Sequence, residues 1–299
     1  MARTLPVCAL LFALPLVARA DDAPTQTVVR LTVTPQAEPT PALRYQLLPE
    51  MREMNPGNPV QGYLICFMEQ NNFYYNKTEV ENREKWQTMP LKDLPLKELR
   101  DYGGAGLRQA DYAARLDKPD WQILLKLRRD GFYTLLPEVQ QMRKLAAALK
   151  VRFRAEVAER RFDDALVTAK TMFALSRHLG EHPTFIGDLV GVAVASLNVG
   201  PVEEMIQQPG CPNLYWALTD LPAPFIDLRQ GRQGERDWAE VEFRLLDETE
   251  PMSNAQLKQF LDRFRALLEA DKESPKTGFI KGDPADWVAA RAKDEDRVD

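Results

Sequence analysis

The sequence predicts an all-α protein built as an array of antiparallel helical hairpins. Apolar residues recur at intervals of three and four along most of the chain after residue 45, whereas strand-like alternation appears only in residues 27–34. Two consecutive amphipathic segments, 138–160 and 162–179, are separated by so few residues that they must fold back on each other. A single strand-like run cannot form a sheet, so stacked helices are the favoured architecture.

The central helical pair carries the clearest periodic signal. In residues 138–160 one stripe contains every large apolar side chain that would face a partner, namely Val139, Met142, Leu145, Leu149, Phe153 and Val157. Residues 162–179 repeat the pattern, with two acidic residues in the first turn and Arg177 and His178 in the last, which suits the helix dipole. We therefore expect the two helices to pack stripe to stripe.

The first 20 residues have the features of a cleaved signal peptide. Arg3 precedes an apolar run over residues 7–17, and Ala18-Arg19-Ala20 matches a cleavage site. We expect cleavage after Ala20 and a secreted or periplasmic protein without a membrane span. Removal of two arginines takes the formal net charge from −5 to −7, so nucleic acid is not an expected partner.

The rest of the chain divides into three parts. Residues 21–42 form an extended N-terminal segment, because prolines bracket the strand-like run. Residues 43–250 form the helical array domain, with helices expected, besides the central pair, at residues 45–54, 59–75, 78–86, 94–102, 107–116, 121–129, 185–199, 213–218 and 237–246. Residues 251–299 contain C-terminal helices, with a clear amphipathic pattern at 254–270, and a polar tail; the chain ends within a predicted helix, so we expect this part to be truncated.

The segment 185–199 is expected to be a buried central helix. It is apolar on most faces, Thr184 is placed to cap it, and small residues recur at Gly187, Gly191 and Ala195, a spacing that lets a neighbouring helix approach closely. It is short for a membrane span and carries an aspartate. Residues 200–201, a Gly-Pro pair, are expected to kink or restart the helix.

The hairpin corner resembles part of a known repeat. Arg161-Phe162-Asp163-Asp164-Ala165-Leu166 is similar to the turn and second-helix opening of a tetratricopeptide repeat, where an aromatic residue, two acids and an alanine stand in this order. The match covers one repeat. The first helix departs from the family at three positions: Arg152 stands where the family has leucine, Phe153 where it has glycine or alanine, and Glu156 where it has tyrosine. Pro183 also comes later in the chain than the proline that closes the repeat. The resemblance implies a tetratricopeptide-like arrangement in part of the array.

A broader resemblance concerns residues 103–229. This stretch, which includes Leu135-Leu136-Pro137-Glu138 and Asn213-Leu214-Tyr215-Trp216-Ala217-Leu218, resembles a family of exported bacterial all-helical proteins of unassigned activity. The resemblance implies an exported location and a helical fold. It provides no catalytic residue.

One string in the sequence matches a catalytic motif. His178-Leu179-Gly180-Glu181-His182 is a literal H-x-x-E-H, in which two histidines one turn apart would bind zinc and the glutamate would act as the base. The motif needs a continuous helix, whereas Gly180 is a helix-stop residue and Pro183 disfavours the helical region for His182. We assign no metal, cofactor or catalytic residue from the sequence.

Three other features could serve binding or packing. Arg143, Lys150, Arg154 and Arg161 would form a basic ridge or a solvated face of paired charges. An aromatic-rich stretch could be a ligand platform or, as we expect, core packing: Phe67, Phe73, Tyr74, Tyr75 and Trp86. Cys66 and Cys211 could form a disulfide in an oxidising compartment or remain buried thiols.

The combined features predict an exported, non-enzymatic binding or scaffold module. Its partner would be another protein or a cell-envelope component, held in a groove between helix pairs. The alternative is a metal-dependent hydrolase that uses His178, Glu181 and His182.

Overall fold

The computed structural model describes residues 45–68, 70–130 and 134–242, and a few residues between 253 and 262. Over these residues the secondary structure consists of helices and turns, with no β-strand and one isolated bridge between Asn55 and Leu116. The all-α prediction is confirmed. The predicted signal peptide, the extended segment 21–42 and most of residues 251–299 lie outside the described residues.

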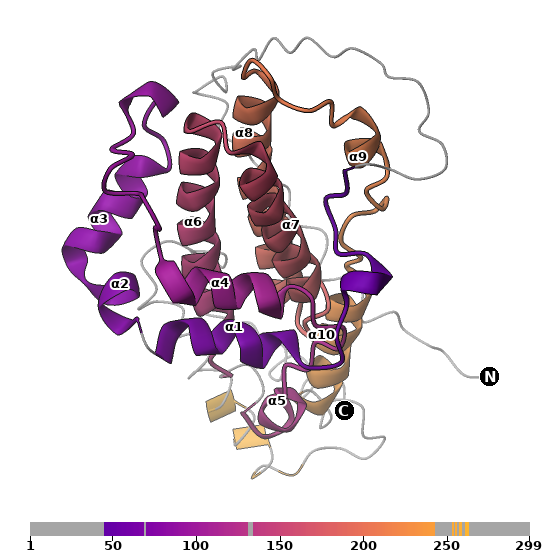
Figure 1. Ribbon diagram of the computed structural model, residues 1–299. Coiled ribbons are helices and arrows are strands. Elements are labelled where there is room, and N and C mark those ends of the chain that lie inside the picture. The colour runs from indigo at the N-terminus through magenta and orange to yellow at the C-terminus, as the bar shows by residue number, and fades with distance from the viewer. Residues whose placement is uncertain are drawn as a thin grey trace, which may run out of the picture. The chain divides into compact units, whose positions relative to one another are not determined.

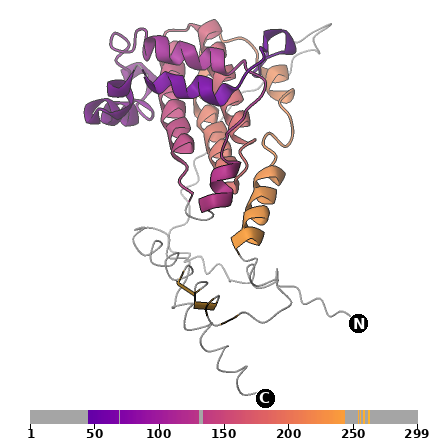
Figure 2. The same ribbon diagram turned by 90° about the horizontal axis from the view of Figure 1, so that it is seen from below.

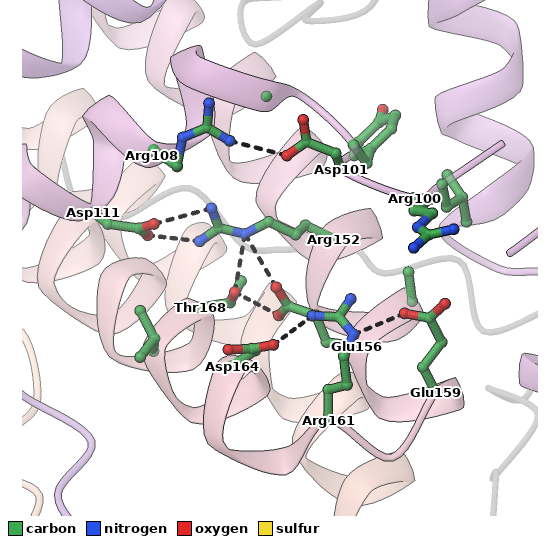
Figure 3. Close-up of a pocket in the computed structure, with 15 residues that line it drawn as sticks. Arg100, Asp101, Arg108, Asp111, Arg152, Glu156, Glu159, Arg161, Asp164 and Thr168 are labelled. Atoms are coloured by element: carbon green, nitrogen blue, oxygen red, sulfur yellow. Dashed lines mark hydrogen bonds and ion pairs between the residues drawn. The ribbon is translucent and has the colours of Figure 1, made fainter. Parts of the chain in front are cut away.

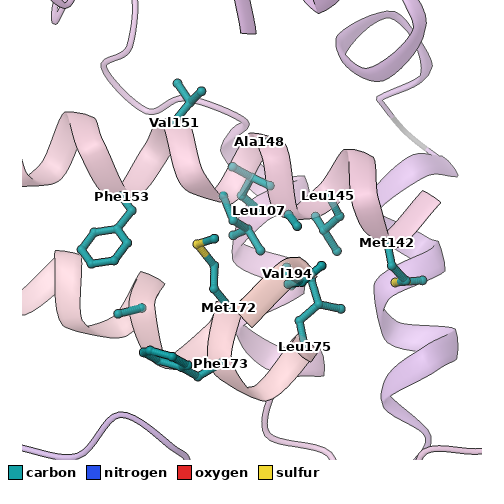
Figure 4. Close-up of a cluster of buried hydrophobic side chains, with 14 of the residues drawn as sticks. Leu107, Met142, Leu145, Ala148, Val151, Phe153, Met172, Phe173, Leu175 and Val194 are labelled. Carbon is teal, nitrogen blue, oxygen red and sulfur yellow. The ribbon is translucent and has the colours of Figure 1, made fainter. Parts of the chain in front are cut away.

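Three long helices form the centre of the fold. They are α6 (Pro137–Ala158), α7 (Phe162–Leu179) and α8 (Phe185–Ile206), and each packs against the other two (Figure 1). The predicted central pair is confirmed, and α7 has the bounds expected from the sequence. The stripe of α6, from Val139 to Val157, is completely buried, and its members Met142, Leu145 and Phe153 belong to one apolar cluster with Met172 and Leu175 (Figure 4).

The corner between α6 and α7 is a Schellman turn. Arg160 has a left-handed backbone, with φ of 58°, and its N–H donates to the carbonyl of Val157 at 3.0 Å. The N–H of Arg161 donates to the carbonyl of Glu156 at 2.9 Å. These two bonds satisfy the last carbonyls of α6 and turn the chain back within three residues.

A second layer crosses this bundle. Helices α1 (Pro59–Met68) and α4 (Gly104–Ala113) pack against each other and lie across α6 and α7 (Figures 1 and 2). They approach closely because residue 62 is glycine: a Cβ there would lie 2.8 Å from the Cβ of Ala113. This crossing places Asp111 of α4 above the α6–α7 pair. The tetratricopeptide-like stacking is not confirmed by this arrangement.

The remaining described helices are shorter or more peripheral. They are α2 (Asn71–Tyr75), α3 (Lys77–Trp86), α5 (Leu124–Asp130), α9 (Tyr215–Thr219) and α10 (Arg229–Glu242). The helices expected at residues 45–54 and 94–102 are wrong, because only 3₁₀ turns form nearby, at Met51–Glu53 and Leu91–Asp93. Segments this short gain too few helical hydrogen bonds to offset the cost of nucleation.

Helix α8 differs from its prediction in two respects. It continues through Pro201 to Ile206 instead of ending near residue 200, because Pro201, Val202 and Met205 are buried in the bundle and this packing offsets the missing backbone hydrogen bond. Its small residues do permit close approach, since a Cβ at Gly191 would lie 2.9 Å from the carbonyl oxygen of Ser176. The expectation that segment 185–199 is a buried central helix is wrong for one face, on which Ile186, Leu189 and Val199 are about half exposed.

The left-handed corner residue provides a test of the fold. We expect Arg160→Gly to raise the free energy of unfolding by up to about 1 kcal/mol, because glycine adopts a left-handed backbone without the clash of a Cβ. Glu159→Gly, at a neighbouring residue with a right-handed backbone, should lower it. Urea denaturation measures both. Destabilisation by Arg160→Gly to the same extent as the control would contradict the corner geometry.

Candidate functional site

A charged cleft of about 790 Å³ lies beside the α6–α7 corner (Figure 3). Its walls come from α4, the loop before α4, α6, the corner and the first half of α7. Four arginines and five acids line it: Arg100, Arg108, Arg152, Arg161, Asp101, Asp111, Glu156, Glu159 and Asp164. We name it the corner cleft.

Helical spacing brings the polar side chains of the corner cleft together. Arg152 and Glu156 are four residues apart on one face of α6, and Asp164 and Thr168 have the same spacing on α7. The tight turn makes these two faces adjacent, and the crossing helix α4 adds Asp111. Polar residues from three helices therefore converge at one place (Figure 3).

The floor of the corner cleft is a fixed ion pair. The guanidinium of Arg152 donates to both carboxylate oxygens of Asp111, at 3.1 and 2.6 Å, and the Thr171 hydroxyl donates to the same carboxylate at 2.8 Å. The side chain of Arg152 is only 12% exposed. A bidentate pair shielded in this way is geometrically rigid, so it orients the groups around it.

Glu156 lies next to this pair and is almost fully buried. The Thr168 hydroxyl accepts from Nε of Arg152 at 2.9 Å and donates to Oε2 of Glu156 at 2.6 Å. Burial raises the pKa of the Glu156 carboxyl to about 7, although nearby Arg152 and the hydrogen bond from Thr168 act in the opposite direction. Glu156 therefore exchanges its proton near neutral pH, where carboxyl groups are normally ionised.

The ion pairs at the rim of the corner cleft are more exposed to solvent than the floor pair. Arg161 donates to Glu159 at 2.8 Å and to Asp164 at 2.5 Å, and its side chain is 43% exposed. Arg108 bonds to Asp101 at 2.9 Å with both side chains largely in solvent. Exposed pairs contribute little to stability and can exchange partners with a ligand at small cost. The cleft thus combines a rigid polar floor with exchangeable charged groups.

The predicted basic ridge does not form. Arg154 is 3% exposed and turns inward, where it donates to Glu204 at 2.6 and 2.7 Å and to the backbone carbonyls of Trp86 and Met89. Arg161 belongs to the corner cleft, and Arg143 alone of the four is exposed without an ion pair among the described residues. The spacing along α6 did not reveal that α3 covers part of this face.

The H-x-x-E-H string does not bring its side chains together. Helix α7 ends at Leu179, Nδ1 of His178 lies 2.9 Å from the Tyr63 hydroxyl, and Nδ1 of His182 accepts from the backbone N–H of Thr184 at 3.1 Å. Glu181 is exposed. No group of three histidine, cysteine or acidic side chains suited to a metal ion occurs among the described residues. The geometry needed for the hydrolase alternative is therefore missing there.

Both histidines act instead as buried neutral groups. Burial lowers the pKa of His178 and the pKa of His182 to about 4. The indole N–H of Trp121 donates to the backbone carbonyl of His178 at 3.2 Å, and its ring packs edge-on against His182 at 4.7 Å. These contacts fasten the end of α7 to α1 and to the segment before α5.

The aromatic-rich stretch packs largely into the core, as expected. Phe67, Tyr74 and Trp86 are buried, Phe73 is partly buried against the core, and Tyr75 is 44% exposed. Cys66 is a buried free thiol and Cys211 is a half-buried free thiol. Neither feature forms a ligand platform or a covalent link.

Comparisons with known proteins add no assignment. No protein-family model, no curated protein and no solved structure matches the chain.

The role of His178 can be tested against the metal-binding alternative. We expect His178→Ala to lower the free energy of unfolding by about 1–3 kcal/mol, because the fully buried Tyr63 hydroxyl loses its partner. The zinc content of the purified protein, measured by mass spectrometry, should not change. The control is Glu181→Gln, at an exposed position. Stoichiometric zinc that is lost in His178→Ala would contradict this structural role.

The raised pKa of Glu156 predicts a pH dependence of stability. Between its ordinary pKa of 4.5 and about 7, the folded protein keeps a proton on Glu156 that the unfolded chain releases. The stabilising contribution of this group is complete below pH 4.5 and is lost as the pH rises through 7. Relative to wild type, Glu156→Gln should therefore gain about 3 kcal/mol in free energy of unfolding between pH 4.5 and 8.

Urea denaturation at a series of pH values measures this difference. Glu159→Gln is the control, because it removes one negative charge from the same cleft at a more exposed position. A difference between wild type and Glu156→Gln that does not vary with pH would contradict the burial of an ionisable Glu156.

Proposed function

We propose that the protein is an exported binding module that holds a polar segment of another protein or of a cell-envelope component in the corner cleft. The export signal in residues 1–20 supports the location, and the acidic net charge argues against nucleic acid as the partner. The observation that carries the proposal is the corner cleft itself: a rigid buried floor surrounded by exposed, exchangeable ion pairs.

The charges of the corner cleft favour a ligand with both donors and acceptors. Asp111 pairs with Arg152 and Asp101 with Arg108, while Glu159 and Asp164 share Arg161. The charge of Arg100, which is unpaired among the described residues, compensates for the second acid there. The cleft therefore has no strong excess of either sign. Arg100, on the rim, forms no hydrogen bond or ion pair among the described residues, so it is available to an acidic group of the ligand.

The apolar part of the lining fits a polypeptide better than a small ion. Val167 is 38% exposed in the cleft, and Leu99, Tyr102 and Ala155 form buried apolar parts of its wall. A peptide segment offers main-chain donors and acceptors together with apolar and charged side chains, which together match this lining. A bound segment would replace the exposed rim pairs while the Arg152–Asp111 pair keeps its geometry.

Site-specific photo-crosslinking tests this proposal. A photoreactive amino acid at Val167 should capture a partner of defined mass in the exported fraction of the native host, because this side chain lies in the cleft and is accessible. The same probe at Ile65, which is 47% exposed on α1, is the matched control. We expect Arg161→Glu to reduce the crosslink by about tenfold or more, which corresponds to about 1.4 kcal/mol of binding.

The outcome is read by mass spectrometry of the crosslinked species. Equal labelling from both probe positions, or a crosslink at Val167 that is indifferent to Arg161→Glu and to Arg108→Glu, would contradict binding in the corner cleft.

A further inference from the structure

Helix α8 presents an uncharged apolar strip to solvent. Ile186, Leu189, Val192 and Val199 are 54, 48, 41 and 53% exposed, and Ala193 and Ser196 are exposed between them. The one charged residue from 185 to 202, Asp188, is buried beneath α10. An uncharged apolar strip of about 20 Å on the protein surface is a candidate contact surface.

The described part of the chain does not cover this strip. Helices α6 and α7 pack against the side of α8 that carries Gly187, Gly191 and Val194. Helix α10 packs near the first turn, where the N–H of Gly231 donates to Asp188 at 3.2 Å and the N–H of Phe185 donates to Glu235 at 3.1 Å. The exposed strip runs away from this anchor toward residue 199. α8 is also the one described helix long and apolar enough to cross a membrane.

The chain contains a second apolar stripe that matches the first in length and character. In residues 254–270 apolar side chains recur at helical intervals: Leu257, Phe260, Leu261, Phe264, Leu267 and Leu268. The residues of this segment that the structure describes are helical, and Leu257 and Leu261 are half-buried while Lys258 and Asp262 are exposed. The segment is therefore amphipathic, with one apolar face to cover.

The connection between the two stripes is short enough to favour an intramolecular contact. Eleven residues separate the end of α10 at Glu242 from residue 254, and an extended chain of that length spans up to about 40 Å. α10 is already anchored at the first turn of α8, so residue 254 is tethered within reach of the whole strip. Such a tether gives an effective concentration on the order of millimolar.

We propose that residues 254–270 dock as an amphipathic helix on the exposed strip of α8. The two apolar stripes pack against each other, while Lys258, Asp262 and the other charged residues of the segment face solvent. This contact adds a fourth helix to the α6–α7–α8 bundle and removes the largest uncharged apolar strip that α8 exposes. It does not involve the corner cleft and is independent of the function proposed for it.

Paired cysteines in the full chain test this docking. In a background with Cys8, Cys66 and Cys211 replaced by alanine, Leu189→Cys is combined with Leu261→Cys and treated with a short bifunctional maleimide. Asp262→Cys replaces Leu261→Cys in the control, because Asp262 lies on the charged face of the segment. We expect the Leu189–Leu261 link to form within one molecule at least about tenfold faster than the control link at micromolar protein.

Three other results would overturn the proposal, each in favour of a different occupant. A link that forms between molecules, with a dimer mass in light scattering, would assign the strip to a second copy. Binding to phosphatidylglycerol vesicles that Leu189→Glu abolishes would assign it to a lipid surface. Equal rates for the two cysteine pairs, with oligomeric state and vesicle binding unaffected by Leu189→Glu, would show that the segment does not dock on α8.

Discussion

The corner between α6 and α7 is the constraint on which the rest of the described structure depends. Residues 159–161 leave too little chain for any arrangement other than an antiparallel pair, and the Schellman bonds of Arg160 and Arg161 fix its direction. This turn makes Arg152 and Glu156 of α6 neighbours of Thr168 on α7. The apolar stripes bury each other below the corner, and the polar faces beside it become the cleft. One local turn therefore sets both the core and the site.

A buried polar network of this kind costs stability unless its members satisfy one another. Arg152 and Asp111 neutralise each other, and Thr168 both accepts from Arg152 and donates to Glu156, so the hydroxyl has little choice of orientation. The hydrogen bond from Thr168 and the nearby charge of Arg152 offset only part of the cost of burying the Glu156 carboxylate, so its pKa is raised. Apolar residues would pack here at lower cost, as they do along the α6 stripe from Val139 to Val157. Stability alone therefore does not explain the polar composition of this site.

The sequence was informative where structure follows from local periodicity and failed where it depends on contacts between distant segments. The bounds of α7 and the Thr184 cap could be predicted because each rests on neighbouring residues. The close approach at Gly191 could be predicted because the spacing of small residues is visible in the sequence, although its partner Ser176 is not. The burial of Arg154 could not, because it depends on α3. The cleft was missed because Asp111 arrives from α4, yet a signal existed: Arg152 and Glu156 are the positions that depart from the tetratricopeptide pattern. Two of the three departures, Arg152 and Glu156, therefore lie at the site together with the matching residues Arg161 and Asp164.

The buried ionisable groups limit the pH range over which the fold is stable, at both its acidic and its basic end. Below pH 6.5 His178 and His182 bind protons in the unfolded chain, whereas in the folded protein they bind protons only at about pH 4. These residues therefore destabilise the fold as the pH falls. Glu156 and Asp188, whose pKa values burial raises to about 7, act in the opposite direction as the pH rises. Between pH 4.5 and 6.5 the two histidines and these two acids change the free energy of unfolding in opposite directions, so their effects largely cancel there. When one of these groups is removed, its opposing effect on the free energy of unfolding is no longer cancelled. The fold is then stable over a narrower pH range.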